Sequence, residues 1–182
     1  ISGGASGIGE ATARLCANEG ATVVIADVGE AGGQQVVNEI CSSGGTAVYT
    51  SCDVSDSDSV AQSIDATVQQ FHGLNIVVNC AGIVHVGLLH EYSEADWDQL
   101  MSVNVKGIFF SIKHAFPHLI RNERSYMINV GSISSLVGQR ATTAYTTSKG
   151  AVLSLTQSIA LDYAAAGLRC NCVCPCITDT PM

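Results

Sequence analysis

The stretch ISGGASGIGEATARLCANEGATVVIAD, residues 1–27, decides the fold class. It opens on a turn with glycines at positions 3, 7 and 9 and continues into a stretch of helical character, Glu10 to Asn18. The nearly unbroken apolar run from Ala21 to Asp27 then predicts a strand covered on both faces. Glycines let a backbone approach a pyrophosphate, and the start of the next helix offers unpaired N–H groups to phosphate. Because the spacing differs from G-x-G-x-x-G, the turn alone is also compatible with an ordinary tight turn.

Asp27 ends this predicted strand, 18 residues after Gly9. A carboxylate in that place accepts hydrogen bonds from the adenosine ribose hydroxyls of a dinucleotide and repels a 2′-phosphate. Two like charges about 4 Å apart cost about 4 kcal/mol at an effective dielectric of 20. No Arg or Lys stands beside Asp27, since Ser6 and Val28 occupy the nearby positions. The residues therefore favour NAD over NADP, and the alternative is that Asp27 is a solvated turn residue.

Strand-like and helix-like stretches alternate along the rest of the chain. Further strands are predicted over Thr46–Cys52, Ile76–Asn79, Tyr126–Val130 and Leu168–Cys174, and further helices over Glu30–Cys41, Ser57–Phe71, Ala95–Phe116 and Ala144–Ala166. Repeated β–α units predict an α/β fold with a doubly wound parallel sheet, the Rossmann fold, in a single domain over residues 1–182. Since the chain opens in the turn and stops soon after a strand, we expect a domain that lacks part of the first strand and the C-terminal substrate lobe.

Composition narrows the class of protein. The chain has 182 residues, 47% of them hydrophobic and 13% charged, with a net charge of −8. These values predict a folded domain with a substantial core and exclude a disordered chain. An acidic, charge-poor surface also argues against nucleic-acid binding. The sequence has neither an apolar run of membrane-spanning length nor a secretory signal at its start, so a cytoplasmic protein is the simplest expectation.

Eight cysteines are present, and four of them alternate at positions 170, 172, 174 and 176. One interpretation is a thiolate metal cluster; the other is a buried strand in which cysteine serves as a small apolar residue. The strand is favoured, because structural zinc needs four convergent ligands and no second cluster of cysteine or histidine has suitable spacing. We therefore expect no metal.

Tyr145 and Lys149 stand at i and i+4 near a helix start, so they share one face. An ammonium close to a phenol favours the phenolate, which would make Tyr145 a usable acid and base at neutral pH. Ser132 follows the predicted strand ending at Val130, at the edge where doubly wound sheets place their ligands. Its hydroxyl could hold a substrate oxygen facing Tyr145. Asn104 lies within a predicted helix, where it could hold a proton-relaying water or serve in a structural hydrogen bond.

Together these motifs resemble the short-chain dehydrogenase/reductase (SDR) family, essentially from end to end. The resemblance implies a catalytic tetrad of Asn104, Ser132, Tyr145 and Lys149. It implies contacts with the cofactor from Gly3, Ser6, Gly7, Ile8, Gly9, Asp27, Asp53, Val54, Asn79, Ala81, Gly82, Tyr145, Lys149, Pro175, Thr178 and Thr180. Four residues depart from the pattern: Ser2 replaces Thr, Asn75 replaces Asp, Cys80 replaces Asn, and Cys176 replaces Gly. Cys176 is the most serious, because a glycine there could serve a positive φ or a close backbone approach.

The expected function is NAD-dependent interconversion of a secondary alcohol and a ketone, with Tyr145 as acid and base. Lys149 would also bind the nicotinamide ribose. Candidate substrate contacts are Val84, His85, Ser134 and Gln139. The alternatives are an NAD-binding sensor or interaction module with little activity, and a 3-oxoacyl-carrier reductase, against which Asp27 argues. Because two long predicted helices are apolar on more than one face, we also expect a homodimer or homotetramer.

Overall fold

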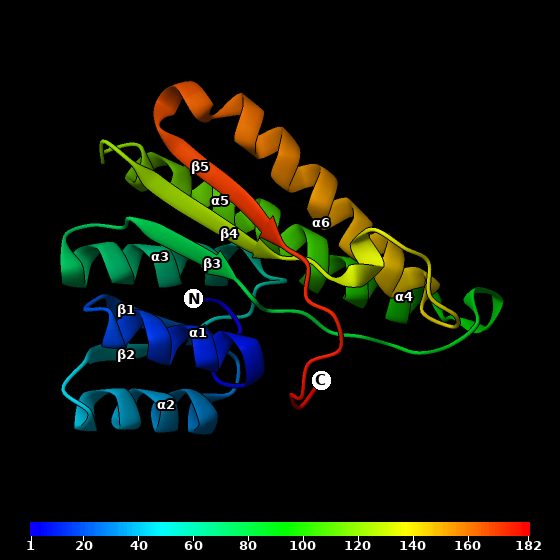
Figure 1. The fold of residues 1–182 in the computed structure, drawn as a ribbon, viewed down its shortest axis with the longest axis horizontal. Coiled ribbons are helices and arrows are strands. Elements are labelled where there is room, and N and C mark those ends of the chain that lie inside the picture. The colour runs from blue at the N-terminus through cyan, green and yellow to red at the C-terminus, as the bar shows by residue number, and fades with distance from the viewer.

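One parallel sheet organises the computed structural model, which describes residues 1–182. Strand β1 (Thr22–Asp27) pairs with β2 (Thr46–Ser51). Strand β3 (Ile76–Asn79) pairs with β4 (Ser125–Val130), which pairs with β5 (Leu168–Val173). Ser2 forms parallel bridges to both Ala26 and Asn79, and so joins the two groups of strands. The order β2-β1-Ser2-β3-β4-β5 confirms the predicted doubly wound α/β fold (Figure 1).

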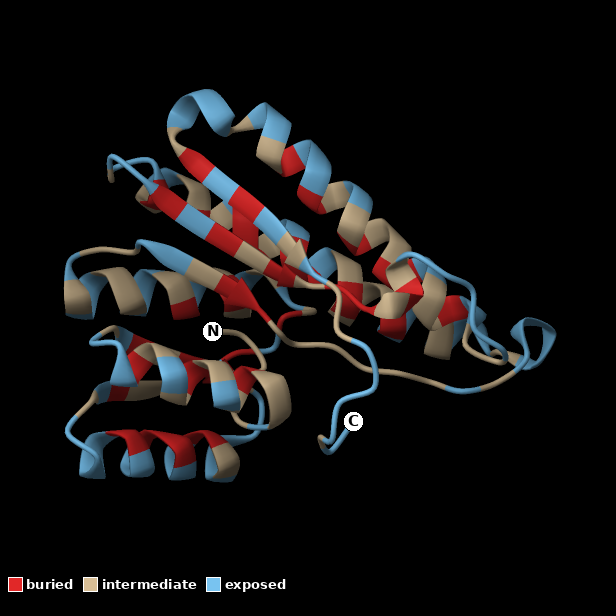
Figure 2. Cartoon of the chain, in the orientation of Figure 1, coloured by how far each residue is buried: buried red, intermediate tan, exposed pale blue.

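Helices cover both faces of the sheet. They are α1 (Gly7–Asn18), α2 (Glu30–Ser42), α3 (Ser57–Phe71), α4 (Glu94–Met101), α5 (Gly107–Leu119) and α6 (Thr143–Asp162). Successive residues of β1 point to opposite sides, since Ile25 packs into a core with α1 and α2 while Ala26 packs with Val54 and Val60. A third core joins α5 and α6 to β4 and β5. Buried and exposed residues alternate along β4 and β5 (Figure 2), because helices cover one face of these strands.

The predicted helix over 95–116 is three elements in the structure. A π-helical segment, Ser102–Lys106, separates α4 from α5 and carries Asn104, which is only 1% exposed. The wider π turn seats this polar amide in the interior, which helical periodicity alone does not predict. Pro117 lies inside α5, which continues to Leu119. The helix predicted to reach Ala166 ends as α6 at Asp162, followed by a 3-10 turn and by Gly167 at φ 81°.

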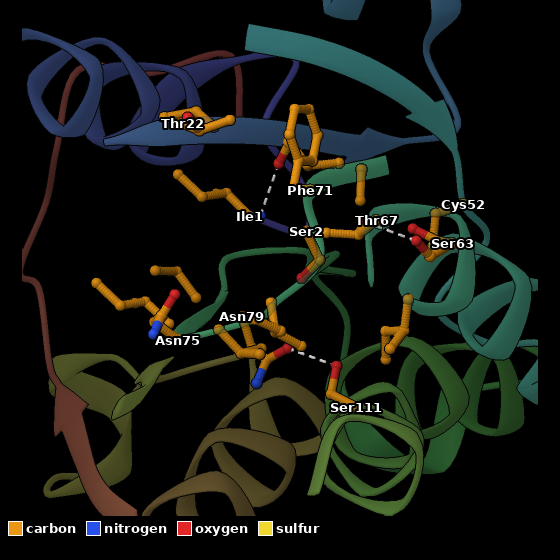
Figure 3. A pocket seen from close by; sticks show the side chains of 18 of the residues that line it. Ile1, Ser2, Thr22, Cys52, Ser63, Thr67, Phe71, Asn75, Asn79 and Ser111 are labelled. Carbon is orange, nitrogen blue, oxygen red and sulfur yellow. Dashed lines mark hydrogen bonds between the residues drawn. The ribbon is translucent and has the colours of Figure 1, made fainter. Parts of the chain in front are cut away.

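A cavity of about 440 Å³ lies between β1 and β3 (Figure 3). Its lining is mostly apolar and includes the early residues of both strands, with Ile1 and Ser2 also contributing. Asn79 and Ser111 lie at its polar side, where Ser111 Oγ donates to Asn79 Oδ1 at 2.7 Å. The predicted cofactor residues Val54 and Asn79 line this cavity. The glycine-rich turn beyond Ser2 does not line it, nor do Ser132, Tyr145 and Lys149, so the cavity is separate from the predicted catalytic groups.

None of the helices combines the length and the hydropathy that a membrane crossing requires. Several large apolar side chains are nevertheless exposed on helices, among them Phe109 of α5 and Leu161 of α6. These are the two helical regions for which we predict contact between subunits, and the oligomeric state stays a prediction.

Candidate active site

The glycine-rich turn packs directly on the segment that follows β3. Gly3 has φ 67°, and a Cβ there would lie 2.6 Å from the backbone nitrogen of Ala81. Gly7 has φ 54°, and a Cβ at Gly9 would overlap the carbonyl of Gly3. The three glycines therefore meet a conformational or spatial need that other residues do not meet without strain. Ser6 is exposed at the helix start, beside the half-buried Ile8.

Asp27 holds the turn to the end of β1. Its Oδ2 accepts a hydrogen bond from the Ala5 N–H at 3.0 Å, and its Oδ1 accepts one from the Gly29 N–H at 2.9 Å. These bonds fix the carboxylate beside the glycine-rich turn, and its contact with a ribose stays a prediction. The side chain is half-buried, so part of it remains open to a ligand.

Other predicted cofactor residues are placed around the same edge. Asp53 is exposed and accepts hydrogen bonds from the backbone and the hydroxyl of Ser55, while Val54 is buried against Gly107. Thr180 returns to the glycine-rich turn, where a Cβ on Gly7 would lie 3.2 Å from Thr180 Cβ. Thr178 is exposed in the same segment, which runs from β5 toward α1 (Figure 1).

The Asn79 side chain is turned into the protein. Its Nδ2 donates to Asn129 Oδ1 at 2.7 Å, and its Oδ1 accepts from Ser111. Both polar atoms are thus engaged in a buried network between β3, β4 and α5. A contact from Asn79 to a cofactor would have to come from its backbone.

Ser132 begins a short 3-10 helix, Ile133–Ser135, just after β4. Its Oγ accepts from the Ser134 N–H at 3.1 Å, and its own N–H donates to Ser135 Oγ at 3.1 Å. This reciprocal capping fixes the side chain and leaves the Ser132 O–H as a donor for a ligand. Ser135 Oγ in turn donates to the Lys149 carbonyl at 2.7 Å, which ties the Ser132 turn to α6.

Lys149 and Tyr145 lie one turn apart on α6, as predicted. The Lys149 Nζ is 5.7 Å from the centre of the Tyr145 ring and donates to the Val130 carbonyl at 2.8 Å. Only 4% of Lys149 is exposed, and this burial lowers its pKa to about 8, against the opposing influence of Cys172, Cys80 and Cys174. Tyr145 is half-buried.

Asn104 links the π-helical segment to two neighbours. Its Oδ1 accepts from the Ile83 N–H at 2.8 Å, and its Nδ2 donates to the Ile83 carbonyl and to Ser148 Oγ, each at 3.0 Å. Gly82 is beside it, since a Cβ there would lie 3.3 Å from Asn104 Oδ1 and 3.5 Å from Lys149 Nζ. These bonds are the structural role that the sequence left open as the alternative to holding a water.

The candidate substrate residues lie on two loops that meet. Ser134 Oγ donates to Gln139 Oε1 at 3.0 Å in the loop after Ser132. Val84 and His85 lie in the loop after Gly82 and are half-buried. The Gly87 N–H donates to the Ala141 carbonyl at 2.8 Å, which joins the two loops by a single bridge. The structure thus brings together the two loops that carry the candidate substrate residues.

The whole chain, residues 1–182, matches the family model described as short chain dehydrogenase. The chain belongs to the short chain dehydrogenase family. It is 40% identical over 183 residues to cis-4-hydroxycyclohexanecarboxylate dehydrogenase of Sinomonas cyclohexanicum, covering all of this chain and 73% of that protein. It is 34% identical over 182 residues to 3-oxoacyl-[acyl-carrier-protein] reductase FabG of Thermotoga maritima, covering 74% of that protein.

A solved short chain dehydrogenase/reductase from Burkholderia phymatum, in complex with NAD, has the same fold. The TM-score is 0.96 at 30% identity, over 99% of this chain and 65% of that one. This short chain dehydrogenase therefore shares its architecture with a protein that binds NAD, and it spans about two thirds of that protein's length.

Two residues that support the site were not predicted from the sequence. Ser135 caps the Ser132 turn and bonds to Lys149, and Ser148 bridges Asn104 to the Tyr145 carbonyl. The pattern Ser132-x-x-Ser135 is a capping-box spacing and could have indicated the first role. Ser148 has no comparable local signal, because its partner Asn104 is 44 residues away.

Two of the four alternating cysteines of this short chain dehydrogenase lie on a strand, which the sequence predicts to reach Cys174 but which ends at Val173. Cys170 and Cys172 belong to β5, and Cys170 is buried in the core with α5 and α6. Cys176 is exposed beyond the strand. Its φ is not positive, which removes one of the two reasons for expecting a glycine there. The structure contains no group of three or more His, Cys, Asp or Glu side chains able to hold a metal ion.

Proposed function

We propose that this chain is the NAD-binding domain of an oxidoreductase that interconverts a secondary alcohol and a ketone. The observation that carries the proposal is the linked placement of three groups. Lys149 lies beside the Tyr145 ring, and its backbone is bonded through Ser135 to the turn that orients Ser132. A hydroxyl donor, a phenol and a buried ammonium at one sheet edge suit proton exchange with a carbinol or carbonyl oxygen.

The residues fit a dinucleotide. Gly3, Gly7 and Gly9 form a turn in which side chains would clash or be strained, followed by the start of α1, where N–H groups can bind phosphate. Asp27 would take the ribose hydroxyls, and the half-buried segment from Ala81 to Gly82 would form the floor near Lys149. The NAD structure of the relative from Burkholderia supports NAD as the first choice. When bound, the cofactor supplies or accepts the hydride.

Each catalytic residue has a defined role in the proposal. Ser132 donates its O–H to the substrate oxygen and positions it against Tyr145. Tyr145 removes the hydroxyl proton in oxidation and returns it in reduction. Lys149 stabilises the tyrosinate electrostatically and binds the nicotinamide ribose. Asn104 holds Ile83 and Ser148 in place, and a water near Asn104 that leads protons out stays part of the proposal.

Cyclic secondary alcohols are the first substrates to test. The relative from Sinomonas is named for a hydroxycyclohexanecarboxylate, and the mixed polar and apolar residues Val84, His85, Ser134 and Gln139 suit a compact, partly polar ring. The similarity to FabG keeps a 3-oxoacyl thioester as the second candidate. The alternative to a dehydrogenase is an NAD-binding module with little activity, and it is motivated by the departure from the family pattern at Cys176.

The test combines cofactor titration with a substrate panel. NAD⁺ and NADP⁺ are titrated by protein fluorescence, and turnover is followed as NADH absorbance with cyclohexanols, linear secondary alcohols and, in reverse, an acetoacetyl thioester. Tyr145→Phe should lower kcat by about 10²–10⁴-fold and leave NAD⁺ affinity unchanged. Tyr126→Phe, on the exposed side of β4, is the matched control. NAD⁺ binding without turnover on any substrate would favour the module; equal activity of Tyr145→Phe would refute the catalytic assignment.

A further inference from the structure

Two of the alternating cysteines are in contact beside the Ser132 turn. Cys172, in β5, and Cys174, just beyond it, are both half-buried, and their sulfur atoms are 3.8 Å apart. Residues i and i+2 of an extended chain share a face, which explains why these side chains meet. Both sulfurs lie over Gly131, where a Cβ would be 2.8 Å from Cys172 Sγ and 3.1 Å from Cys174 Sγ.

The backbone next to the two cysteines is hydrogen-bonded to both neighbours of Ser132. The Gly131 N–H donates to the Val173 carbonyl at 2.7 Å, and the Ile133 N–H donates to the Pro175 carbonyl at 2.8 Å. Any shortening between Cys172 and Cys174 therefore acts on the turn that carries Ser132. The same shortening moves the start of the segment from Pro175 to Thr180.

We propose that Cys172 and Cys174 form a redox modification site, in which a hydroperoxide closes them into a reversible intrachain disulfide that displaces the Ser132 turn. One thiolate attacks a peroxide oxygen and breaks the O–O bond, which gives a sulfenic acid and one water. The second sulfur then attacks the first and releases another water. Two thiols and one hydrogen peroxide thus yield one disulfide and two waters, and the two electrons pass to the peroxide.

Formation of the disulfide requires a local movement of the two cysteines. The sulfurs must approach from 3.8 Å to about 2.05 Å. Two extended residues span about 6.6 Å between Cα atoms, at the upper end of the range for disulfides, whose common value is about 5.5–6 Å. The strand end therefore contracts on oxidation. Burial, followed by the hydrogen bond with Cys174, raises the pKa of the Cys172 thiol and so disfavours its thiolate.

The bond is tested by mass spectrometry on the folded 182-residue chain. Reduced protein is treated with hydrogen peroxide, alkylated and cut with trypsin, which releases Cys170–Met182 after Arg169. We expect two of the four cysteines of this peptide to escape alkylation and the peptide to be two hydrogen atoms lighter than the same peptide with these two thiols reduced. No backbone fragments should arise between positions 172 and 174, and dithiothreitol should restore the two hydrogen atoms. Cys172→Ser and Cys174→Ser should abolish this product, whereas Cys41→Ser, exposed on α2, should retain it. A bond to Cys170 or Cys176 instead, or no bond, would overturn the proposal.

The effect on the turn is read without any enzymatic assay. Loss of one backbone hydrogen bond corresponds to about fivefold faster amide exchange. Deuterium uptake at residues 131–135 should therefore rise about fivefold on oxidation, and uptake in α2 should stay unchanged. Formation of the Cys172–Cys174 bond with unchanged uptake at residues 131–135 would refute the coupling. Because both readouts are independent of turnover, the outcome is distinguishable from failure of the proposed dehydrogenase activity.

Discussion

The Lys149 ammonium donates to the backbone carbonyl of Val130 at 2.8 Å, in a place where only 4% of the lysine is exposed. A carbonyl oxygen satisfies one of the three N–H donors but does not neutralise the charge. Burial therefore dominates and lowers the pKa of Lys149 to about 8, although Cys172, Cys80 and Cys174 act in the opposite direction. A positive charge at this position lowers the stability of the folded protein without ligand, and it is available to stabilise an anion.

Lys149→Met should stabilise the protein at neutral pH. A lysine with a folded pKa near 8 and an ordinary value of 10.5 binds fewer protons folded than unfolded between these pH values. Its contribution to stability is therefore fully favourable above pH 10.5 and is lost as pH falls through 8. The shift corresponds to about 3 kcal/mol. Urea unfolding at pH 7 and pH 10 should show the stability advantage of Lys149→Met shrinking by most of this amount, because the unfolded lysine is still partly protonated at pH 10.

The comparison between the two proteins isolates the lysine. Burial raises the pKa of Cys80 to about 11, although Lys149 acts in the opposite direction, and stability therefore falls over an overlapping pH range. Because burial is the larger cause, most of this fall is common to both proteins. A stability difference that is the same at both pH values would contradict the prediction.

Ser148→Ala should destabilise the protein by about 1–3 kcal/mol. It removes an acceptor from the buried Asn104 amide, and the bond to the Tyr145 carbonyl is lost as well. Thr147→Ala is the control, because Thr147 is exposed on the same helical turn and its hydroxyl bonds only to the Thr143 carbonyl. Urea unfolding measures both variants. Equal stabilities of the two would mean that Asn104 gains nothing from Ser148.

Gly9→Ala should destabilise the protein by about 1–3 kcal/mol, because the added methyl group meets the Gly3 carbonyl. Gly150→Ala should instead stabilise it by about 0.5–1 kcal/mol. Gly150 lies within α6, and a Cβ there meets nothing within 4 Å. Thermal unfolding of both variants checks the contrast. A Gly9→Ala protein as stable as the parent would show that the turn has room to move.

Asp27→Ser should tighten NADP⁺ binding at least about tenfold, since a carboxylate no longer faces the 2′-phosphate. It should also weaken NAD⁺ binding through the loss of ribose hydrogen bonds. Glu19→Gln, exposed at the end of α1 that lies away from the glycine-rich turn, also removes one negative charge and serves as control. Fluorescence titration gives both dissociation constants. An unchanged ratio in Asp27→Ser would exclude this carboxylate from cofactor selection.

Local patterns explain what the sequence predicted well. Helix α3 has the predicted bounds, Ser57–Phe71, because Asp56 caps its start through the Asp58 N–H and His72 ends it with φ 59°. Strand β3 also has its predicted bounds, as a short apolar run. Such boundaries depend on residues next to them in the chain.

The remaining features depend on distant partners. The amide of Asn104 in the π turn is held by two residues more than 20 positions away. Ile83 donates its N–H to this amide, and Ser148 Oγ accepts from it. Asn79 stands in a motif that resembles a cofactor contact, yet its side chain bonds to Asn129, 50 residues away. Neither partner can be inferred from spacing, so the roles of these two amides required the structure.

The hydrogen bond from Gly87 to Ala141 couples the two loops that carry the candidate substrate residues. Each loop has many exposed residues, so neither is held in place by a core of its own. A backbone hydrogen bond connects the first loop, held at Ile83 by Asn104, to the second loop, held at Gln139 by Ser134. Under the proposed dehydrogenase function, the opening of this bridge would contribute to substrate entry and product release, so the dwell time of a product would depend in part on residues that do not touch it.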